Sequence, residues 1–177
     1  MLLTDDRYKE FHIHCHRVSL YNPENRNTAE RVAVSKILNW YKANGYADRI
    51  TYSTSTVAIP SVNGKFLWDA DVYKFVTGWL SSASDEMIKH VAFGVTMTDD
   101  STSLDHVIRG KKIYQIFESK RTSEIYPVRH LTKQQVWDML PDDLRGMAWS
   151  CRRPLYINDQ AFICKECKTC KQIAAFG

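Results

Sequence analysis

The sequence has almost none of the features that mark a membrane protein or a secreted protein. No apolar run in its 177 residues approaches the roughly 18 residues of a membrane-spanning helix. The opening residues, Met-Leu-Leu-Thr-Asp-Asp-Arg, place acidic side chains where a signal peptide needs positive charge. We therefore expect a soluble, cytoplasmic protein with no membrane partner.

Glycine and proline are also scarce, with 7 and 5 residues, and we find no internal repeat, low-complexity tract or linker rich in both. Hydrophobic residues make up 44% of the chain and aromatic residues 12%, which is enough for one ordinary core. The formal charge of +4 is much weaker than the clustered basic stripe of a dedicated nucleic-acid binder. Composition thus indicates a folded globular chain and leaves its partner unknown. A protein partner or a second copy of the chain is a better expectation than nucleic acid.

Two segments have the apolar spacing of amphipathic helices. In residues 28–44 the apolar side chains share one face, Asn27 and Glu30 fit an N-cap arrangement, and Gly45 can close the helix. In residues 71–84 the apolar face is broad, and we expect all of it to be core. The apolar positions of the two helices are Val34, Ile37, Leu38 and Tyr41, and then Val72, Phe75, Val76, Trp79, Leu80 and Ala83.

Extended segments alternate with these helices. Residues 11–20, 49–58 and 90–95 are typical of strands, residues 60–64 of a turn, and residues 104–117 of a helix. Thr132-Lys-Gln-Gln135 is a capping box that opens a short helix, which Pro141 stops. This alternation predicts an α/β domain with helices on at least one face of the sheet and right-handed crossovers. Because such sheets place their chemistry at the carboxyl ends of strands, residues 94–103 are the loop where we expect a site.

The five cysteines are unequally spaced. Cys151, Cys164, Cys167 and Cys170 include two Cys-x-x-Cys steps that share Cys167, and disulfides among the last three would close strained loops. The spacing favours a closed, structural site for one zinc ion with four thiolate ligands and no open position for a catalytic water. A redox dithiol and an iron–sulfur cluster are the alternatives. Cys15 stands apart, and we expect it to be a buried free thiol.

Basic residues surround these cysteines, namely Arg152, Arg153, Lys165, Lys168 and Lys171. They would compensate the charge of −2 that four thiolates leave around one dication, and this is the interpretation we favour. A zinc knuckle that contacts RNA is the alternative.

The C-terminal third resembles a known family. The residues that carry the resemblance are Pro127-Val-Arg-His-Leu-Thr-Lys133, Trp149-Ser150-Cys151 and the Cys164, Cys167 and Cys170 cluster. In order and spacing they are similar to the end of 7-cyano-7-deazaguanine synthases (QueC), although the gap after the first cysteine is longer here. Upstream, Gly94-Val-Thr-Met-Thr-Asp99 resembles the Gly-Val-Asn-x-x-Asp loop of that family, and Asp105 matches the aspartate of the following substrate loop.

The resemblance implies a fold and a domain division. The family consists of PP-loop (N-type ATP pyrophosphatase) ligases that convert 7-carboxy-7-deazaguanine, ammonia and ATP into the nitrile, in queuosine biosynthesis. We accordingly expect an incomplete PP-loop (HUP-like) α/β fold with a mostly parallel sheet and flanking helices over residues 1–144. A zinc-binding segment over residues 145–177 would pack on it. The implied pocket residues are Gly94, Thr96, Asp99, Asp105 and Lys133.

The resemblance fails at the nucleotide site. The family depends on an N-terminal Ser-Gly-Gly-x-Asp-Ser loop whose backbone amides bind pyrophosphate, and this sequence has Asp5 and Asp6 instead of the glycines. The arginine and asparagine that open the family's next helix are replaced by Asp71-Val-Tyr-Lys74. We therefore name no catalytic residue and expect a non-enzymatic relative, kept as a binding module. The alternative is an active ligase that obtains its nucleotide loop from another chain.

Two further groups of polar residues contain side chains of the types that bind metal ions. His12, His14 and His16 alternate along a predicted strand, so their rings share one face and suit either a metal ion or a plain polar face. Asp99, Asp100, Asp105 and His106 form an acidic stretch that suits a divalent cation or a solvated loop. Neither group by itself indicates an enzyme.

Overall fold

The computed structural model describes residues 3, 5–21, 24–58, 69–83, 88–99, 104–117 and 122–176, with the backbone alone for residues 104–107. The chain forms two compact units. One unit comprises Met1–Pro60 and Trp137–Gly177, and the other comprises Ser61–Val136. This division differs from the boundary between residues 144 and 145 that the resemblance implies, and that boundary stays a prediction. The predicted turn at residues 60–64 lies outside the described residues.

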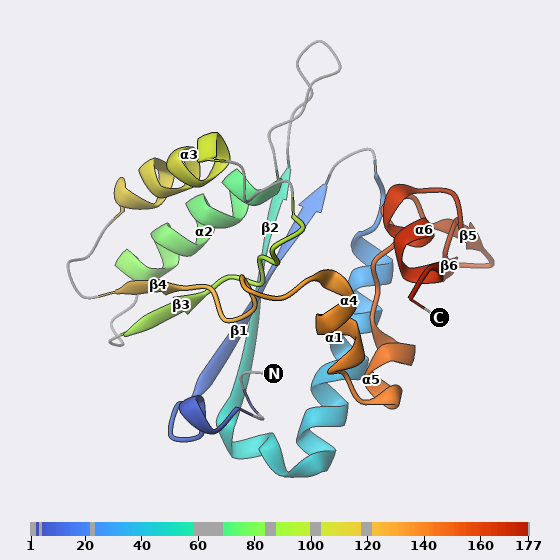
Figure 1. Cartoon of the computed structure of the whole chain (residues 1–177), viewed down its shortest axis with the longest axis horizontal. Coiled ribbons are helices and arrows are strands. Elements are labelled where there is room, and N and C mark those ends of the chain that lie inside the picture. The colour runs from blue at the N-terminus through green and yellow to red at the C-terminus, as the bar shows by residue number, and fades with distance from the viewer. Residues whose placement is uncertain are drawn as a thin grey trace. The chain divides into compact units, whose positions relative to one another are not determined.

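The first unit is built around a parallel pair of strands. A 3-10 turn at Asp6–Tyr8 precedes β1 (Ile13–Tyr21), which pairs in parallel with β2 (Ile50–Ala58) over nine residues of each strand. Helix α1 (Asn27–Tyr41) connects the two strands, as a parallel pair requires (Figure 1). A π-helical turn (Lys42–Tyr46) and a 3-10 turn (Ala47–Arg49) then lead into β2. Both predicted strands and the helix are confirmed.

The two ends of α1 differ in how well they follow the expectation. Gly45 has a φ of 88°, the left-handed conformation that glycine adopts without steric cost, and the chain leaves the helix there as predicted. At the other end, the predicted N-cap is wrong, because Arg26 occupies the cap position and its carbonyl accepts from the Glu30 N–H at 3.0 Å. The Asn27 side chain instead donates to the Leu20 carbonyl at 2.6 Å and ties the helix start to the end of β1.

The core of this unit lies between α1 and one face of the strand pair. Leu3, Leu38 and Ile50 are buried together, and the partly buried side chains of Ile13, Val34, Tyr41 and Tyr46 pack against them. Ile13 and Ile50 are partners in the strand register and point to the same face. The predicted core role of Leu38 is therefore confirmed, and the side chains at 14, 16, 51 and 53 point to the opposite face.

The C-terminal part of this unit consists of short elements. Helix α5 (Asp142–Met147) contacts α1, where the Trp40 indole donates to Asp143 at 3.3 Å. Strands β5 (Leu155–Ile157) and β6 (Gln160–Phe162) form an antiparallel hairpin, and α6 (Lys168–Ala174) follows (Figure 1). Asn158 and Asp159 both have positive φ, at 49° and 61°, as a two-residue hairpin turn requires. This hairpin was not predicted from the sequence.

The second unit packs two helices beside a second parallel pair. Its elements are α2 (Asp69–Ala83), β3 (His90–Ala92), α3 (Leu104–Gln115) and β4 (Ser123–Ile125), and β3 pairs with β4 in parallel. Helices α2 and α3 approach closely at Gly78, where an added Cβ would lie 3.0 Å from the Phe117 ring. Helix α4 (Lys133–Asp138) begins with the predicted capping box, since the Thr132 and Gln135 side chains each accept from the other's backbone N–H.

The expectation that the whole apolar face of α2 is core is wrong. Val72 and Val76 are buried, but Phe75 and Trp79 each keep 51% of their surface exposed. The apolar stripe of α2 is wider than the surface that covers it, so only its centre is buried. The observed architecture is thus a mixed α/β chain with small parallel sheets, and it does not by itself establish a PP-loop fold.

Candidate metal centre

Four cysteines from three segments meet at one point. Cys151 follows α5, Cys164 follows β6, Cys167 is the cap residue of α6, and Cys170 lies in its first turn. The twelve residues between the first two cysteines form the β5–β6 hairpin, whose tight turn returns the chain to its starting point. The hairpin therefore brings Cys151 and Cys164 together although twelve residues separate them.

The geometry of the cluster fits a tetrahedral metal. All four Sγ atoms lie within 4.8 Å of one another, and those of Cys164 and Cys170 are 3.9 Å apart. With zinc–sulfur bonds of about 2.3 Å, the edge of a regular tetrahedron is about 3.8 Å. Cys151 and Cys170 are buried, with 1% and 8% of their surface exposed. No other group of three or more potential ligands this close occurs in the described part of the chain.

Backbone N–H groups already point at the sulfur atoms. The Cys164 N–H donates to Cys151 Sγ, and the Cys167 N–H donates to Cys164 Sγ, both at 3.3 Å. Lys165 lies between them in the left-handed region, with a φ of 61°, and this conformation turns the chain tightly around the second sulfur. Such N–H groups stabilise thiolates, the form in which cysteine binds metal.

The pKa values of the four thiols diverge. The Cys167 N–H lowers the pKa of Cys164. Burial acts to raise the pKa of Cys167, but backbone N–H groups of Arg152 and Cys170 outweigh it and lower the value to about 6. Burial raises the pKa of Cys151, and it raises that of Cys170 to about 12. The chain alone therefore keeps only part of the cluster ionised, and a dication would supply the charge that ionises the rest.

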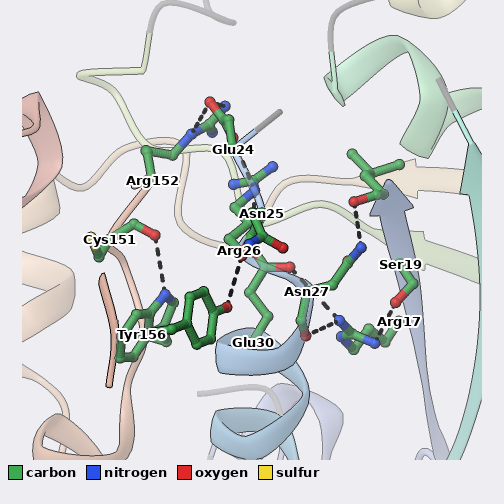
Figure 2. Close-up of polar contacts among 12 residues, drawn as sticks. Arg17, Ser19, Glu24, Asn25, Arg26, Asn27, Glu30, Cys151, Arg152 and Tyr156 are labelled. Carbon is green, nitrogen blue, oxygen red and sulfur yellow. Dashed lines mark hydrogen bonds and ion pairs between the residues drawn. The ribbon is translucent and has the colours of Figure 1, made fainter. Parts of the chain in front are cut away.

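Arg152 links the cluster to the start of α1. Its side chain donates to Glu24 Oε1 from Nε at 3.0 Å and from Nη2 at 2.9 Å, and Arg26 pairs with both Glu24 and Glu30, at 3.1 and 3.3 Å (Figure 2). Arg17 extends this network on the β1 side, with its Nη1 donating to Ser19 at 2.7 Å. The basic residue next to the first cysteine is thus engaged with protein carboxylates.

Of the five pocket candidates, the structure brings three together. Asp99 pairs with Lys133 at 2.9 Å and accepts from both the backbone N–H and the hydroxyl of Thr96, at 2.7 and 2.8 Å. Gly94 is exposed, with nothing within 4 Å of an added Cβ. Asp105 lies in the first turn of α3, among residues 104–107, for which the backbone alone is described. Asp100 lies outside the described residues.

A further polar cluster of the second unit was missed from the sequence. The partly buried Lys74 Nζ contacts Glu124 at 2.8 Å and Tyr126 Oη at 2.7 Å, and lies 3.7 Å from the centre of the Phe93 ring. Burial lowers the pKa of Lys74 and Glu124 opposes that effect. In the sequence, Lys74 stands out only as a charged residue within the largely apolar α2 segment. Strand β4, which precedes Tyr126, has three residues, too few for a strand pattern to be recognised.

Cys15 and the histidines belong to the β1–β2 pair. Cys15 is half-buried, and burial raises the pKa of its thiol, which agrees with a structural free cysteine. The rings of His12, His14 and His16 share one face as predicted, and their nitrogens are hydrogen-bonded to hydroxyl groups of β2.

Comparison with protein-family models, curated proteins and solved structures finds no match to this chain. The likeness to 7-cyano-7-deazaguanine synthases thus rests on the motifs alone. In the described ranges, no helix has the length and apolar character needed to cross a bilayer.

Proposed function

We propose that the four cysteines bind one zinc ion that stabilises residues 151–176, which we call the C-terminal lobe. We propose also that this lobe serves as a binding module. The observation that carries the proposal is the convergence of four Sγ atoms within 4.8 Å, from segments with little regular structure of their own. Strands β5 and β6 have three residues each and α6 has seven, so hydrogen bonds and apolar burial alone hold them weakly. Four protein ligands fill a tetrahedral zinc, which then has no open position for a substrate or an activated water.

The donor set favours zinc over other metals. Four thiolates suit zinc and iron–sulfur chemistry, whereas calcium and magnesium prefer oxygen ligands. A single tetrahedron of sulfur atoms holds one ion without bridging sulfides. We therefore assign zinc, with Cys151, Cys164, Cys167 and Cys170 as ligands.

We propose further that the protein is a relative of the 7-cyano-7-deazaguanine synthases and is not ATP-dependent on its own. In its favour, the loop residue Asp99 contacts the helix-start residue Lys133, which is distant in sequence, and also accepts from the nearby Thr96 hydroxyl. Against ATP use, Asp5 lies where the resemblance expects loop glycines, and its carboxylate is held by Arg7 at 2.6 Å. This hydrogen bond lowers the pKa of Asp5, so the group stays ionised and, unlike a backbone N–H, offers a phosphate no hydrogen-bond donor.

Zinc content tests the first proposal. Purified chain analysed by inductively coupled plasma mass spectrometry should contain about one zinc per molecule, and Cys167→Ser should lose it. Cys15→Ser is the matched control, because it removes a cysteine outside the cluster. Well under one zinc per folded chain, or equal loss from both variants, would refute the assignment.

Pyrophosphate release tests the second proposal. The purified chain, given ATP, magnesium, ammonia and 7-carboxy-7-deazaguanine, should release no pyrophosphate above background. The second candidate, a ligase that takes its nucleotide loop from another chain, is supported by the retained contact of Asp99 with Lys133. It predicts turnover only when that companion chain is added. Turnover by the chain alone would show that our interpretation of the N-terminal residues is wrong.

A further inference from the structure

A continuous chain of side-chain hydrogen bonds runs along the face of β1 and β2 that is opposite to α1. His12, which directly precedes β1, bonds through Nε2 to Thr51 at 2.9 Å. Thr51 also bonds to His14 Nδ1 at 2.8 Å, and His14 Nε2 bonds to Ser53 at 2.7 Å. Ser53 in turn bonds to His16 Nδ1 at 2.7 Å, and His16 Nε2 bonds to Ser55 at 2.9 Å.

The strand register produces this order. His14 is paired with Thr51, and His16 with Ser53. The Thr51 hydroxyl lies between the rings of His12 and His14, and the Ser53 hydroxyl lies between those of His14 and His16. The rings of His14 and His16 are stacked, with centroids 6.4 Å apart. An alternation of three imidazoles with three hydroxyls requires two strands with matching polar positions, and either strand alone would leave gaps.

Hydrogen counting shows that the links are coupled. A hydroxyl between two rings has one hydrogen, so it can donate to only one of them; when it does, it accepts from the N–H of the other ring. A neutral imidazole likewise carries one N–H and one acceptor nitrogen. If His12 donates from Nε2, Thr51 must donate to His14 Nδ1, and the same direction follows at every later link. All three neutral rings then adopt one tautomer.

The side chains become less exposed to solvent from His12 towards His16. His12 and His14 are exposed, His16 is partly buried, and Val18 and Leu20 further along the same face are buried. β2 adds only hydroxyls and Val57 to this face, while α1 covers the other face through Ile13 and Ile50. The two strands thus present no carboxylate, lysine or arginine beside the rings. Burial, and then the charge of His14, lowers the pKa of His16.

We propose that these six side chains form a proton relay between solvent at His12 and Ser55, the partly buried last member of the series. A proton taken up at His12 Nδ1 releases the Nε2 proton to Thr51, whose own hydrogen passes to His14 Nδ1. His14 then passes its Nε2 proton to Ser53, whose hydrogen goes to His16 Nδ1. His16 passes its Nε2 proton to Ser55, whose hydrogen passes to a base beside it, either a water molecule or a basic atom of a bound ligand. One proton enters, one leaves, and every hydrogen bond has reversed its direction.

Two physical points define what this relay can do. Transfer through each hydroxyl must be concerted with the next step, because a free alkoxide lies too high in energy near neutral pH. The reversed chain must also turn its rings or hydroxyls back before a second proton can follow in the same direction. On this face Val18 is paired with Ser55, and Leu20 and Val57 lie beyond them, so the relay delivers its proton beside Ser55 and no further along the strands.

Nitrogen NMR on the ¹⁵N-labelled, zinc-loaded full chain tests the relay with two variants of equal shape. Ser53→Thr keeps the bridging hydroxyl, and Ser53→Val fills the same space without it. Above the ordinary histidine pKa of about 6.5, long-range ¹H–¹⁵N spectra of the wild type should show one tautomer at all three rings. In Ser53→Val, exchange of the His16 ring N–H with water should be slower than in the wild type, because the link from His14 to His16 is lost.

The outcomes separate clearly. Wild-type exchange rates in Ser53→Thr together with slowed exchange in Ser53→Val would support the relay. Different tautomers among the three wild-type rings would overturn it, and this measurement needs no variant. Equal exchange in the two variants would overturn it as well, because it would show that protons reach His16 directly from water.

Discussion

The guanidinium of Arg152 binds the carboxylate of Glu24 across 128 residues of sequence, with two hydrogen bonds of 3.0 and 2.9 Å. Arg152 directly follows Cys151, and its backbone N–H lowers the pKa of Cys167. Glu24 lies in the connection from β1 to α1 and also pairs with Arg26. Arg152 therefore contacts the cysteine cluster through its backbone N–H. Its side chain contacts the first βα connection at Glu24 (Figure 2).

A double-mutant cycle on Arg152→Ala and Glu24→Gln should reveal this contact. The two side chains keep 43% and 30% of their surface exposed, so solvent screens the pair. We expect a coupling free energy of only about 0.5 kcal/mol in urea unfolding of the zinc-loaded protein. Arg153→Ala, the change at the exposed neighbouring residue, should show no coupling with Glu24→Gln. A coupling of zero for the first pair would show that the contact does not anchor the cluster in solution.

Core substitutions should separate Leu38 from Trp79. Leu38 is buried with Leu3 and Ile50, so Leu38→Ala should destabilise the protein by about 2–5 kcal/mol. Trp79 keeps 51% of its surface exposed, so Trp79→Ala should cost about 2 kcal/mol, less than the loss of a fully buried tryptophan. Thermal unfolding of both variants measures the difference. A larger loss for Trp79→Ala would indicate that another surface covers that side of α2 in solution.

Elements with a long, regular pattern were predicted well, and elements held by distant contacts were not. Helix α1 has 15 residues and strands β1 and β2 have nine each, which is long enough for apolar spacing or β-branched composition to indicate the element. Strands β4, β5 and β6 have three residues each, which is too short for alternation to appear. Their pairing partners, and the turn at Asn158 and Asp159, determine them instead.

The candidate sites follow the same rule. The cysteine cluster was predictable because three of its four ligands lie within seven residues, so local spacing carries most of the geometry. The Lys74 cluster was not, since its partners Glu124 and Tyr126 come from a strand end about 50 positions away. The exposure of Trp79 was also out of reach, because periodicity shows which side of a helix is apolar and not how much of it is covered.

The stability that Asp99 contributes should depend on pH in a defined direction. Burial acts to raise the pKa of Asp99, but hydrogen bonds from Lys133 and Thr96 outweigh it and lower the value below 3.8. A carboxyl group with a lowered pKa stabilises the fold above its unfolded value, and this contribution disappears as the pH falls through the folded value. Asp99→Asn should thus be less stable than the wild type at pH 7, and the difference should shrink below pH 3.8.

Urea unfolding at several pH values measures that difference. Acid also protonates cysteine ligands, but it does so in both proteins, so the comparison between them isolates Asp99. Lys133→Met should reduce the pH dependence by removing the charged partner of Asp99. A constant difference between Asp99→Asn and the wild type across this range would contradict the ion pair.

Removal of the metal should unfold the C-terminal lobe. Structural zinc bound to zinc-finger peptides contributes roughly 10–16 kcal/mol of apparent binding free energy at neutral pH, which is comparable with the stability of a whole domain. The β5–β6 hairpin and α6 have little else to hold them, because most of their large apolar side chains are exposed. Leu155, Ile157 and Phe162 keep 56%, 59% and 45% of their surface accessible. A strong chelator should therefore expose the backbone of residues 151–176, and added zinc should restore its protection.

Hydrogen–deuterium exchange followed by mass spectrometry locates the effect. In the chelated wild type and in Cys167→Ser, peptides from residues 151–176 should exchange much faster than in the zinc-loaded protein. Peptides from β1 should change less, because their partner β2 and the Leu38 core remain. Cys15→Ser should retain zinc and slow exchange in the lobe, since its thiol lies outside the cluster. If the lobe keeps full protection after the zinc is removed, its short elements are stable by themselves and the metal has another role.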